Sequence, residues 1–193
     1  MEQLLTRIAW FVGLVLVQVL MLNNVCLFGL ATPFVYVYFL LALDRDIDHN
    51  ALMVLAFLIG LVVDIFSNTP GVNAGASVLV AFMRPSLLRL FSPRDEYENF
   101  EPGIYPLGLW GFVRYALVAV WVHHTALFLL EAFSWANIGH LAMRIICSTA
   151  LTMTLVTPLA AVVYSRWGVD CIILAEAILL AVAASCESLI TWH

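Results

Sequence analysis

The sequence contains no lysine and few charged residues of any kind. Only 11% of its 193 residues are charged, and all eight basic residues are arginines. Soluble domains average roughly 25% charged residues, which help to cover their hydrated surface. With 64% hydrophobic residues and a mean hydropathy of +1.01, the chain is predicted to be an integral membrane protein. A soluble enzyme and a nucleic-acid-binding protein are both excluded by this composition.

Motifs that carry chemistry are also missing from the sequence. The four cysteines form no CxxC pair and are expected to be buried thiols: Cys26, Cys147, Cys171 and Cys186. There is no HExxH motif and no glycine-rich phosphate loop. His123 and His124 diverge by about 100° on a helix, so they cannot chelate one ion together. We expect them to form interhelical hydrogen bonds, and the sequence predicts no enzyme, no metal and no cofactor.

The dominant feature is a series of long apolar runs. A helix of roughly 20 residues crosses the hydrocarbon core of a bilayer. Seven runs approach this length: Leu4–Leu22, Val25–Leu43, Ala51–Phe66, Val72–Phe91, Leu107–Phe133, Leu141–Tyr164 and Val169–Ile190. The runs lack the alternation of a barrel strand, so the prediction is an all-α polytopic membrane protein. Six helices occupy residues 1–165, and the hydrophobic extension 166–193 is either a seventh span or an appended segment.

Arginine predicts the orientation of these spans. Five arginines lie at the start of the first run or in and beside alternate connections: Arg7, Arg45, Arg89, Arg94 and Arg166. The other connections, at 23–24, 67–71 and 134–140, contain no arginine or lysine. Because basic residues favour the cytoplasmic side, the N-terminus is expected in the cytoplasm. The hydrophilic loop Ser92–Pro106 would then be cytoplasmic, either as a solvated loop or as a docking segment.

Asp64 is the clearest ionisable residue within an apolar run. Such a side chain is costly at bilayer depth, so it needs a partner. Gly60 lies one turn earlier and would let another backbone approach. Pro70 and Gly71 predict a tight turn, and Asn73 can cap the next helix. Asp64 either holds this turn through backbone N–H groups, or contacts a partner or ligand, or relays protons.

Other polar and small residues predict packing within or between chains. Glu131 and Arg144 flank the connection between the fifth and sixth runs and are expected to form an ion pair. Small residues at helical spacing, Ala74, Ser77 and Ala81 in the fourth run and Ala177, Ala181 and Ser185 in the last, fit internal packing or a partner's membrane helix. Pro33 is expected to break the second run near the outer surface, so that Val25–Thr32 would be a re-entrant or interfacial piece.

Several strings, in this order, resemble the rod shape-determining protein MreD family, in a version like that of the Bacteroides group. They are Gln18–Asn24, Ala31–Phe34, Gly60–Ala74, Phe82–Pro85 and His123–Phe133, and the most specific is the Gly-Leu-x-x-Asp run followed by Pro70-Gly71. The resemblance covers roughly residues 5–165. The apolar extension that follows departs from the family pattern.

The resemblance implies a non-catalytic scaffold in the inner membrane of a rod-forming bacterium. Proteins of this family bind MreC, a single-span protein with a large periplasmic part. They connect MreB indirectly with RodA and a class B penicillin-binding protein, which build peptidoglycan. The resemblance also implies a six-helix fold like that of the substrate-binding subunits of vitamin transporters. The turn Asn68–Asn73 and the fourth helix are then candidate surfaces for the MreC-like partner. Membrane lipid is the other expected partner, and no nucleic acid is expected.

Two other classes of function stay open. A small-molecule-binding subunit of a transporter needs a polar cavity, which Asp64, Asn73, His124 and Glu131 could line. An intramembrane enzyme or lipid-handling protein needs ionisable groups that converge at one depth, and His124 and Glu131 are the pair to test. On a helix these two residues share a face but lie about 10 Å apart.

Overall fold

The computed structural model describes residues 12–22, 31–43, 47–91, 104–132 and 138–164. Residues 12–17 are α-helical and continue into a short π-helical turn. The elements in chain order are η1 (Gln18–Leu22), α2 (Val37–Ala42), α3 (His49–Ser67), α4 (Val72–Phe91), α5 (Ile104–Ala132) and α6 (Ile138–Tyr164). The described part of the chain contains helices and no β-strand, as the sequence predicted.

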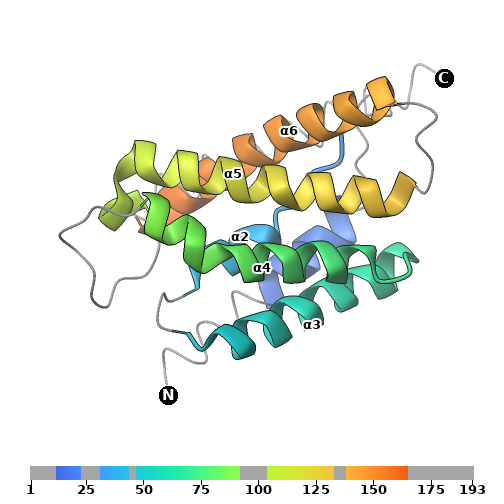
Figure 1. Cartoon of the computed structure of the whole chain (residues 1–193), viewed down its shortest axis with the longest axis horizontal. Helices are drawn as coiled ribbons and strands as arrows, with labels where there is room; N and C mark the ends of the chain where they lie inside the picture. Colours follow the sequence, from blue (N-terminus) through green and yellow to red (C-terminus); the bar gives the residue numbers. More distant parts are fainter. Residues whose placement is uncertain (1–11, 23–30, 44–46, 92–103, 133–137, 165–193) are drawn as a thin grey trace.

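Four long helices lie side by side in chain order, from α3 at one edge through α4 and α5 to α6 (Figure 1). The short helix α2 contacts both α4 and α5. Each of the four long helices is long and apolar enough to cross a membrane. The turn from α3 to α4 lies at the same end of the bundle as the C-terminal end of α5 and the start of α6 (Figure 1). We call this end of the molecule the hairpin end.

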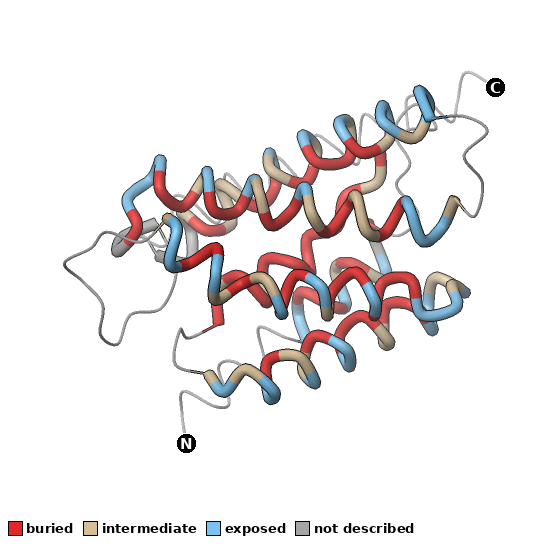
Figure 2. Tube along the Cα trace, viewed as in Figure 1, coloured by how far each residue is buried: buried red, intermediate tan, exposed pale blue. Residues whose placement is uncertain are grey.

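Buried residues face the neighbouring helices, and exposed residues face outward (Figure 2). The outward residues are largely apolar, and Ile65, Phe82 and Trp110 are more than half exposed, at 68%, 58% and 74%. An outer surface of this kind suits lipid rather than water. Both the interior and the exterior of the bundle are therefore apolar, which is the distribution expected of a membrane protein.

The second predicted span is the main correction to the expected fold. Residues Ala31–Tyr36 are not helical, and α2 contains only six residues. Proline has no N–H and its ring excludes the helical turn before it, which accounts for the break at Pro33. Six residues are far fewer than the roughly 20 that a span requires. The predicted break at Pro33 is confirmed, whereas the run Val25–Leu43 is wrong as a single span.

The other spans agree with prediction. The helix predicted for Val72–Phe91 has those bounds, while α3, α5 and α6 differ by a few residues from the runs Ala51–Phe66, Leu107–Phe133 and Leu141–Tyr164. Gly108, with φ of +69°, kinks α5 near its start. The first run is helical over its described residues, 12–22. The seventh run lies outside the described residues, as do residues 4–11 of the first run. Within the described residues, four helices are long and apolar enough to span a membrane, so the expected spans are confirmed for these four.

Polar side chains mark the ends of the helices. The Asp48 carboxylate accepts hydrogen bonds from the N–H groups of Asn50 and Ala51, at 3.0 and 3.1 Å, and so caps the start of α3. Asn68 ends α3 in the left-handed conformation, with φ of +54°. Asparagine tolerates this conformation better than most residues, so the local sequence favours a tight turn here.

Two charged residues are buried beside helix ends. Asp64 lies beside an N-terminus, and Arg84 lies beside a C-terminus. Asp64 is 2% exposed and lies beside the N-terminus of α4. Arg84 is 1% exposed, and its guanidinium donates a hydrogen bond to the main-chain oxygen of Leu43, which follows the last residue of α2. Free N–H groups attract an anion and free carbonyl groups attract a cation. Each charge is therefore placed where unpaired backbone groups compensate it.

Candidate functional site

The carboxylate of Asp64 holds the turn between α3 and α4. Its Oδ1 atom accepts hydrogen bonds from the Thr69 hydroxyl at 2.5 Å and from the main-chain and side-chain N–H groups of Asn73, both at 3.0 Å. Its Oδ2 atom accepts from the Ala74 N–H at 2.9 Å. The N–H groups in the first turn of α4 have no acceptor within that helix, so the carboxylate supplies one. The hydrogen bonds confirm the interpretation that Asp64 holds the turn.

Gly60 permits the close contact between α3 and α4 beside this carboxylate. A Cβ atom at this position would lie 2.4 Å from Ala74 Cα, 2.6 Å from Ala74 N and 2.6 Å from Asn73 O. All three atoms belong to the backbone, so no side-chain rotation could make room. Glycine therefore brings Asp64, one turn later, within hydrogen-bonding distance of α4.

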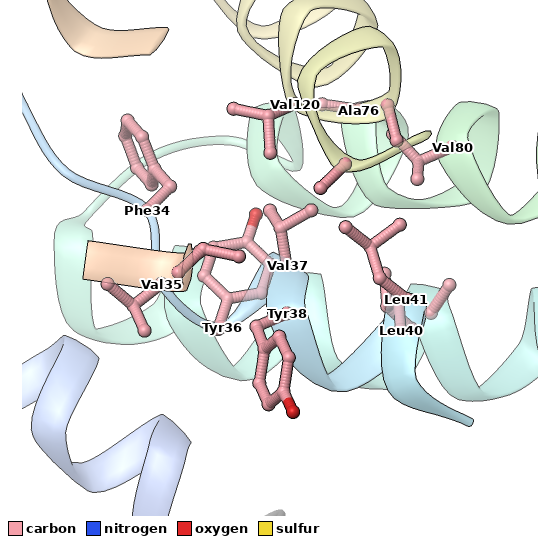
Figure 3. Close-up of a cluster of buried hydrophobic side chains, with 14 of the residues drawn as sticks. Phe34, Val35, Tyr36, Val37, Tyr38, Leu40, Leu41, Ala76, Val80 and Val120 are labelled. Carbon is pink, nitrogen blue, oxygen red and sulfur yellow. The ribbon is translucent and has the colours of Figure 1, made fainter. Parts of the chain in front are cut away.

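Tyr36 connects this turn to α5. Its hydroxyl lies 3.3 Å from Asn73 Oδ1, 3.2 Å from Ser77 Oγ and 2.9 Å from His123 Nε2. Figure 3 shows Tyr36 and Tyr38 pointing to opposite sides of the segment that leads into α2. Because the Tyr36 ring is fully buried, its hydroxyl needs these partners. One phenol thus links the segment before α2 with both α4 and α5.

The non-helical segment before α2 is held by a glutamine from the first helix. Gln18 is fully buried, and its Nε2 donates to the Pro33 main-chain oxygen at 3.0 Å. Its Oε1 accepts from the Val35 N–H at 2.8 Å. A backbone that leaves the helix in an apolar interior must find such substitutes for its lost hydrogen bonds. Gln18 therefore satisfies one donor and one acceptor of the break.

Two hydroxyl groups of α6 accept hydrogen bonds from two further N–H groups of this segment. Ser148 Oγ accepts from the Thr32 N–H at 3.0 Å, and Thr152 Oγ1 accepts from the Phe34 N–H at 3.1 Å. Thr152 Oγ1 also lies 3.3 Å from His124 Nε2. This bond joins α5 to α6 and confirms the predicted interhelical hydrogen bond for His124. His123 instead bonds to Tyr36, which lies in the non-helical segment before α2.

A pocket of about 290 Å³ opens at the hairpin end. It lies between the turn after α3, the C-terminal part of α5, the start of α6 and the segment before α2. Its walls combine hydroxyl, amide, charged and aromatic side chains: Thr32, Phe34, Phe66, Ser67, Thr69, Val72, Asn73, Leu127, Phe128, Glu131 and Arg144. Of the four residues expected to line a ligand cavity, Asn73 and Glu131 reach this pocket, while Asp64 and His124 do not line it.

The predicted ion pair between Glu131 and Arg144 forms at this pocket. One guanidinium nitrogen of Arg144 lies 3.1 Å from Oε2 and 3.3 Å from Oε1 of Glu131. The guanidinium also lies over the Phe128 ring, 4.4 Å from its centroid. The arginine side chain is 26% exposed and the glutamate side chain 44% exposed. The pair therefore joins α5 to α6 at the entrance rather than deep in the core.

The remaining candidate residues divide between the surface and the core. Pro70 and Gly71 are exposed in the turn, and Gly71 has φ of +78°, which glycine adopts without strain. Ser77 and Ala81 are fully buried against other helices of this chain. Their small size therefore serves packing inside the bundle, and they offer no free surface to a partner.

Several predicted regions lie outside the described residues. They are residues 4–11 of the first run, residues 25–30 of the second run, residues 92–103 of the Ser92–Pro106 loop, and the apolar run Val169–Ile190 with its small residues Ala177, Ala181 and Ser185. Three of the four cysteines, Cys26, Cys171 and Cys186, lie there as well.

The sequence did not identify the side chains that hydrogen-bond the non-helical segment around Pro33. Gln18, Tyr36, Ser148 and Thr152 were not assigned a role, although all four carry polar groups within apolar runs. Ser148 and Thr152 are four residues apart and therefore lie on one helical face. That spacing was the available signal, since two hydroxyls on one face can bond a neighbouring backbone.

The described helices bring no group of three His, Cys, Asp or Glu side chains close enough to hold a metal ion. No family model, curated protein or solved structure matches this chain. Function must therefore be argued from the residues and their geometry.

Proposed function

We propose that this chain is a non-catalytic scaffold of the cell-elongation complex in a rod-forming bacterium, of the MreD type. In this proposal it binds an MreC-like single-span protein and acts with RodA and a class B penicillin-binding protein, with MreB linked indirectly. It lies in the inner membrane with its N-terminus in the cytoplasm, as the distribution of arginine favours.

The observation that carries this proposal is that the sequence strings that resemble the MreD family lie close together in the fold. The strings Ala31–Phe34, Gly60–Ala74 and His123–Phe133 are far apart in the sequence. Hydrogen bonds join their neighbourhoods: Asn73 Nδ2 donates to Asp64, the Tyr36 hydroxyl donates to Asn73 Oδ1, and the same hydroxyl bonds to His123 Nε2. Strings that belong together in a family are expected to describe one structural unit, and these do converge on one. Their polar groups bond to one another, which favours a rigid structural role over catalysis.

The exposed side of α4 and the adjoining turn are the proposed docking surface for the partner's membrane helix. Pro70 and Gly71 lie exposed at the hairpin end of this surface, and Leu79 and Phe82 are 39% and 58% exposed along α4. In a bilayer such a helix face is free to pack against another helix. The buried Ser77 lies on the other side of α4 and supports this surface from within.

Site-specific crosslinking in native membranes tests the proposal. A photoreactive amino acid at Leu79 or Phe82 is expected to capture a single-span protein with a large periplasmic domain. The matched control position is Trp121 on α5, which is 46% exposed and lies outside the proposed surface. A mild-detergent pull-down should recover the same protein together with wall-synthesis enzymes, and depletion of the chain should turn rods into spheres. Recovery of no such protein from any position would reject the scaffold proposal.

A second candidate function is a small-molecule-binding subunit of a transporter. The pocket favours it, because its volume and its mixture of polar and aromatic walls suit a small ligand. This function predicts that the purified chain retains a small molecule and co-purifies with an energising ATPase. Recovery of wall-synthesis enzymes without either of these would reject it.

A further inference from the structure

We infer that the pocket at the hairpin end binds a zwitterion, in which an ammonium group lies a few ångströms from a carboxylate or phosphate. Arg144 would take the anionic group and Glu131 the cationic group. The inference rests on the second candidate function and names the class of its ligand. Its test is separable from that of the scaffold proposal, because Glu131 and Arg144 lie outside the proposed partner surface on α4 and the adjoining turn.

The volume and walls of the pocket suit a small polar molecule. At about 290 Å³ it is near the lower limit of sites that hold small ligands. The Thr32 and Thr69 side chains and the Asn73 amide contribute polar groups to the lining, and the Phe34 and Phe66 rings contribute apolar surface. Six of the eleven lining residues are polar or charged, so the walls suit a polar ligand rather than an apolar one.

The geometry of the ion pair leaves capacity for a ligand. Both hydrogen bonds to Glu131 come from the same guanidinium nitrogen of Arg144. A guanidinium has five N–H donors in a planar fork, so further donors remain available on the arginine. The glutamate side chain is 44% exposed, which leaves its carboxylate accessible to a cation from the pocket entrance.

Charge balance selects a zwitterion over a simple ion. The pair is neutral as a whole, so a ligand with a single charge would add a net charge to the site and compete with one residue of the pair for the other. A zwitterion keeps the site neutral, because its anionic group can use the remaining donors of Arg144 while its cationic group binds the exposed Glu131 carboxylate. Complementary charges of this kind set specificity more than affinity.

The site is held in place before a ligand arrives. The Arg144 guanidinium lies over the Phe128 ring at 4.4 Å, which limits its movement. Thr32 at the pocket wall is fixed through its own N–H, which donates to Ser148 on α6. Groups that are already ordered lose less conformational entropy on binding.

The same chemistry is present in two sources, a free amino acid and the headgroup of phosphatidylethanolamine. The test uses the full chain in a neutral, lipid-free detergent, with binding measured by calorimetry and by the shift in melting temperature. The zwitterionic probes are L-alanine and glycerophosphoethanolamine. The single-charge and neutral probes are ethanolamine, glycerophosphoglycerol and inositol. Native mass spectrometry of chain taken from bilayers of defined composition then detects retained phosphatidylethanolamine.

Neutralising one residue at a time should change the charge selectivity of the pocket. Glu131→Gln is expected to weaken zwitterion binding about tenfold and to strengthen binding of the anionic glycerophosphoglycerol, because Arg144 then lacks its partner. Arg144→Gln should also weaken zwitterion binding but strengthen binding of the cationic ethanolamine, because Glu131 then lacks its partner. Arg114→Gln is the matched control, since Arg114 is exposed on α5, bonds to the Trp110 oxygen and does not line the pocket.

Binding of either zwitterion with the predicted switch in selectivity would support the inference, and retained lipid would identify the headgroup as the source. The inference is overturned if inositol or glycerophosphoglycerol binds wild-type chain as well as the zwitterions do. It is also overturned if both Gln variants bind as wild type, or if no zwitterion binds. In those cases, co-purification of an ATPase with the chain would still support the transporter function. If the chain binds a zwitterion but no ATPase co-purifies with it, the transporter function is rejected and the binding result is unaffected.

Discussion

Replacing Gly60 with alanine tests the contact that brings Asp64 to the start of α4. The added Cβ would lie 2.4 Å from Ala74 Cα and 2.6 Å from Asn73 O. Carbon atoms in favourable contact are roughly 3.5–4.0 Å apart, so the helices would have to separate by about 1 Å. The obstructing atoms are all backbone, and the strain cannot be relieved by a new rotamer.

The magnitude follows from two effects. Overpacking in a close-packed interior costs about 1–3 kcal/mol. A separation of this size would also stretch the 2.9 Å bond from Ala74 N–H to Asp64 and the 3.0 Å bond from Asn73 N–H. Hydrogen bonds to a charged group contribute about 1.5–3 kcal/mol each. We therefore expect Gly60→Ala to lower the free energy of unfolding by at least about 3 kcal/mol.

Thermal unfolding of the purified full chain in mild detergent, followed by size-exclusion chromatography, measures this loss. Gly75→Ala is the matched control in the same region. A Cβ there meets only the Leu130 Cδ1 atom, at 3.3 Å, which can move aside. Alanine also favours a helix over glycine by about 1 kcal/mol, so this control should be as stable as wild type or slightly more stable. If Gly60→Ala melts at the temperature of the control, the argument for a close backbone contact is refuted.

Three further changes test the polar groups around this contact. Asp64→Asn should reduce stability by about 1–3 kcal/mol, because its NH₂ group faces N–H donors; a melting temperature equal to wild type would contradict this. Thr152→Val should cost a similar amount by leaving the Phe34 N–H without its acceptor, whereas Thr154→Val, at an exposed position bonded to its own helix, should have little effect on thermal unfolding. In a double-mutant cycle, Glu131→Gln and Arg144→Gln should show a coupling energy below about 1 kcal/mol, since the pair is partly exposed; a much larger value would indicate a desolvated clamp.

The apolar runs alone predicted much of the fold. Long uninterrupted runs bounded by turn residues yielded the bounds of α4 and approximated those of α3, α5 and α6. The prediction failed for the second run, because hydropathy does not distinguish a straight helix from a broken segment with apolar side chains. Pro33 signalled the break, but its extent depended on partners elsewhere in the chain.

The candidate site was predictable where its residues are close in sequence. Asp64 and Asn73 belong to one helix–turn–helix unit, and Glu131 and Arg144 flank one short connection, so local spacing identified both pairs. The bond from Thr152 to the Phe34 N–H joins residues 118 positions apart and could not be found in this way. Sequence alone offered no means of matching a backbone donor in one segment with a hydroxyl in another.

Composition and periodicity by themselves determined the class of protein, the long helices and the turn after Asp64, because each depends on residues within about 20 positions of one another. Only the tertiary structure decided that Ser77 and Ala81 face inward, that Gln18 and Thr152 support the segment around Pro33, and that a pocket opens beside the Glu131–Arg144 pair. The physical reason is that an apolar environment supplies no water for unpaired backbone groups. They must be satisfied by whichever side chains the packing of distant helices brings to them.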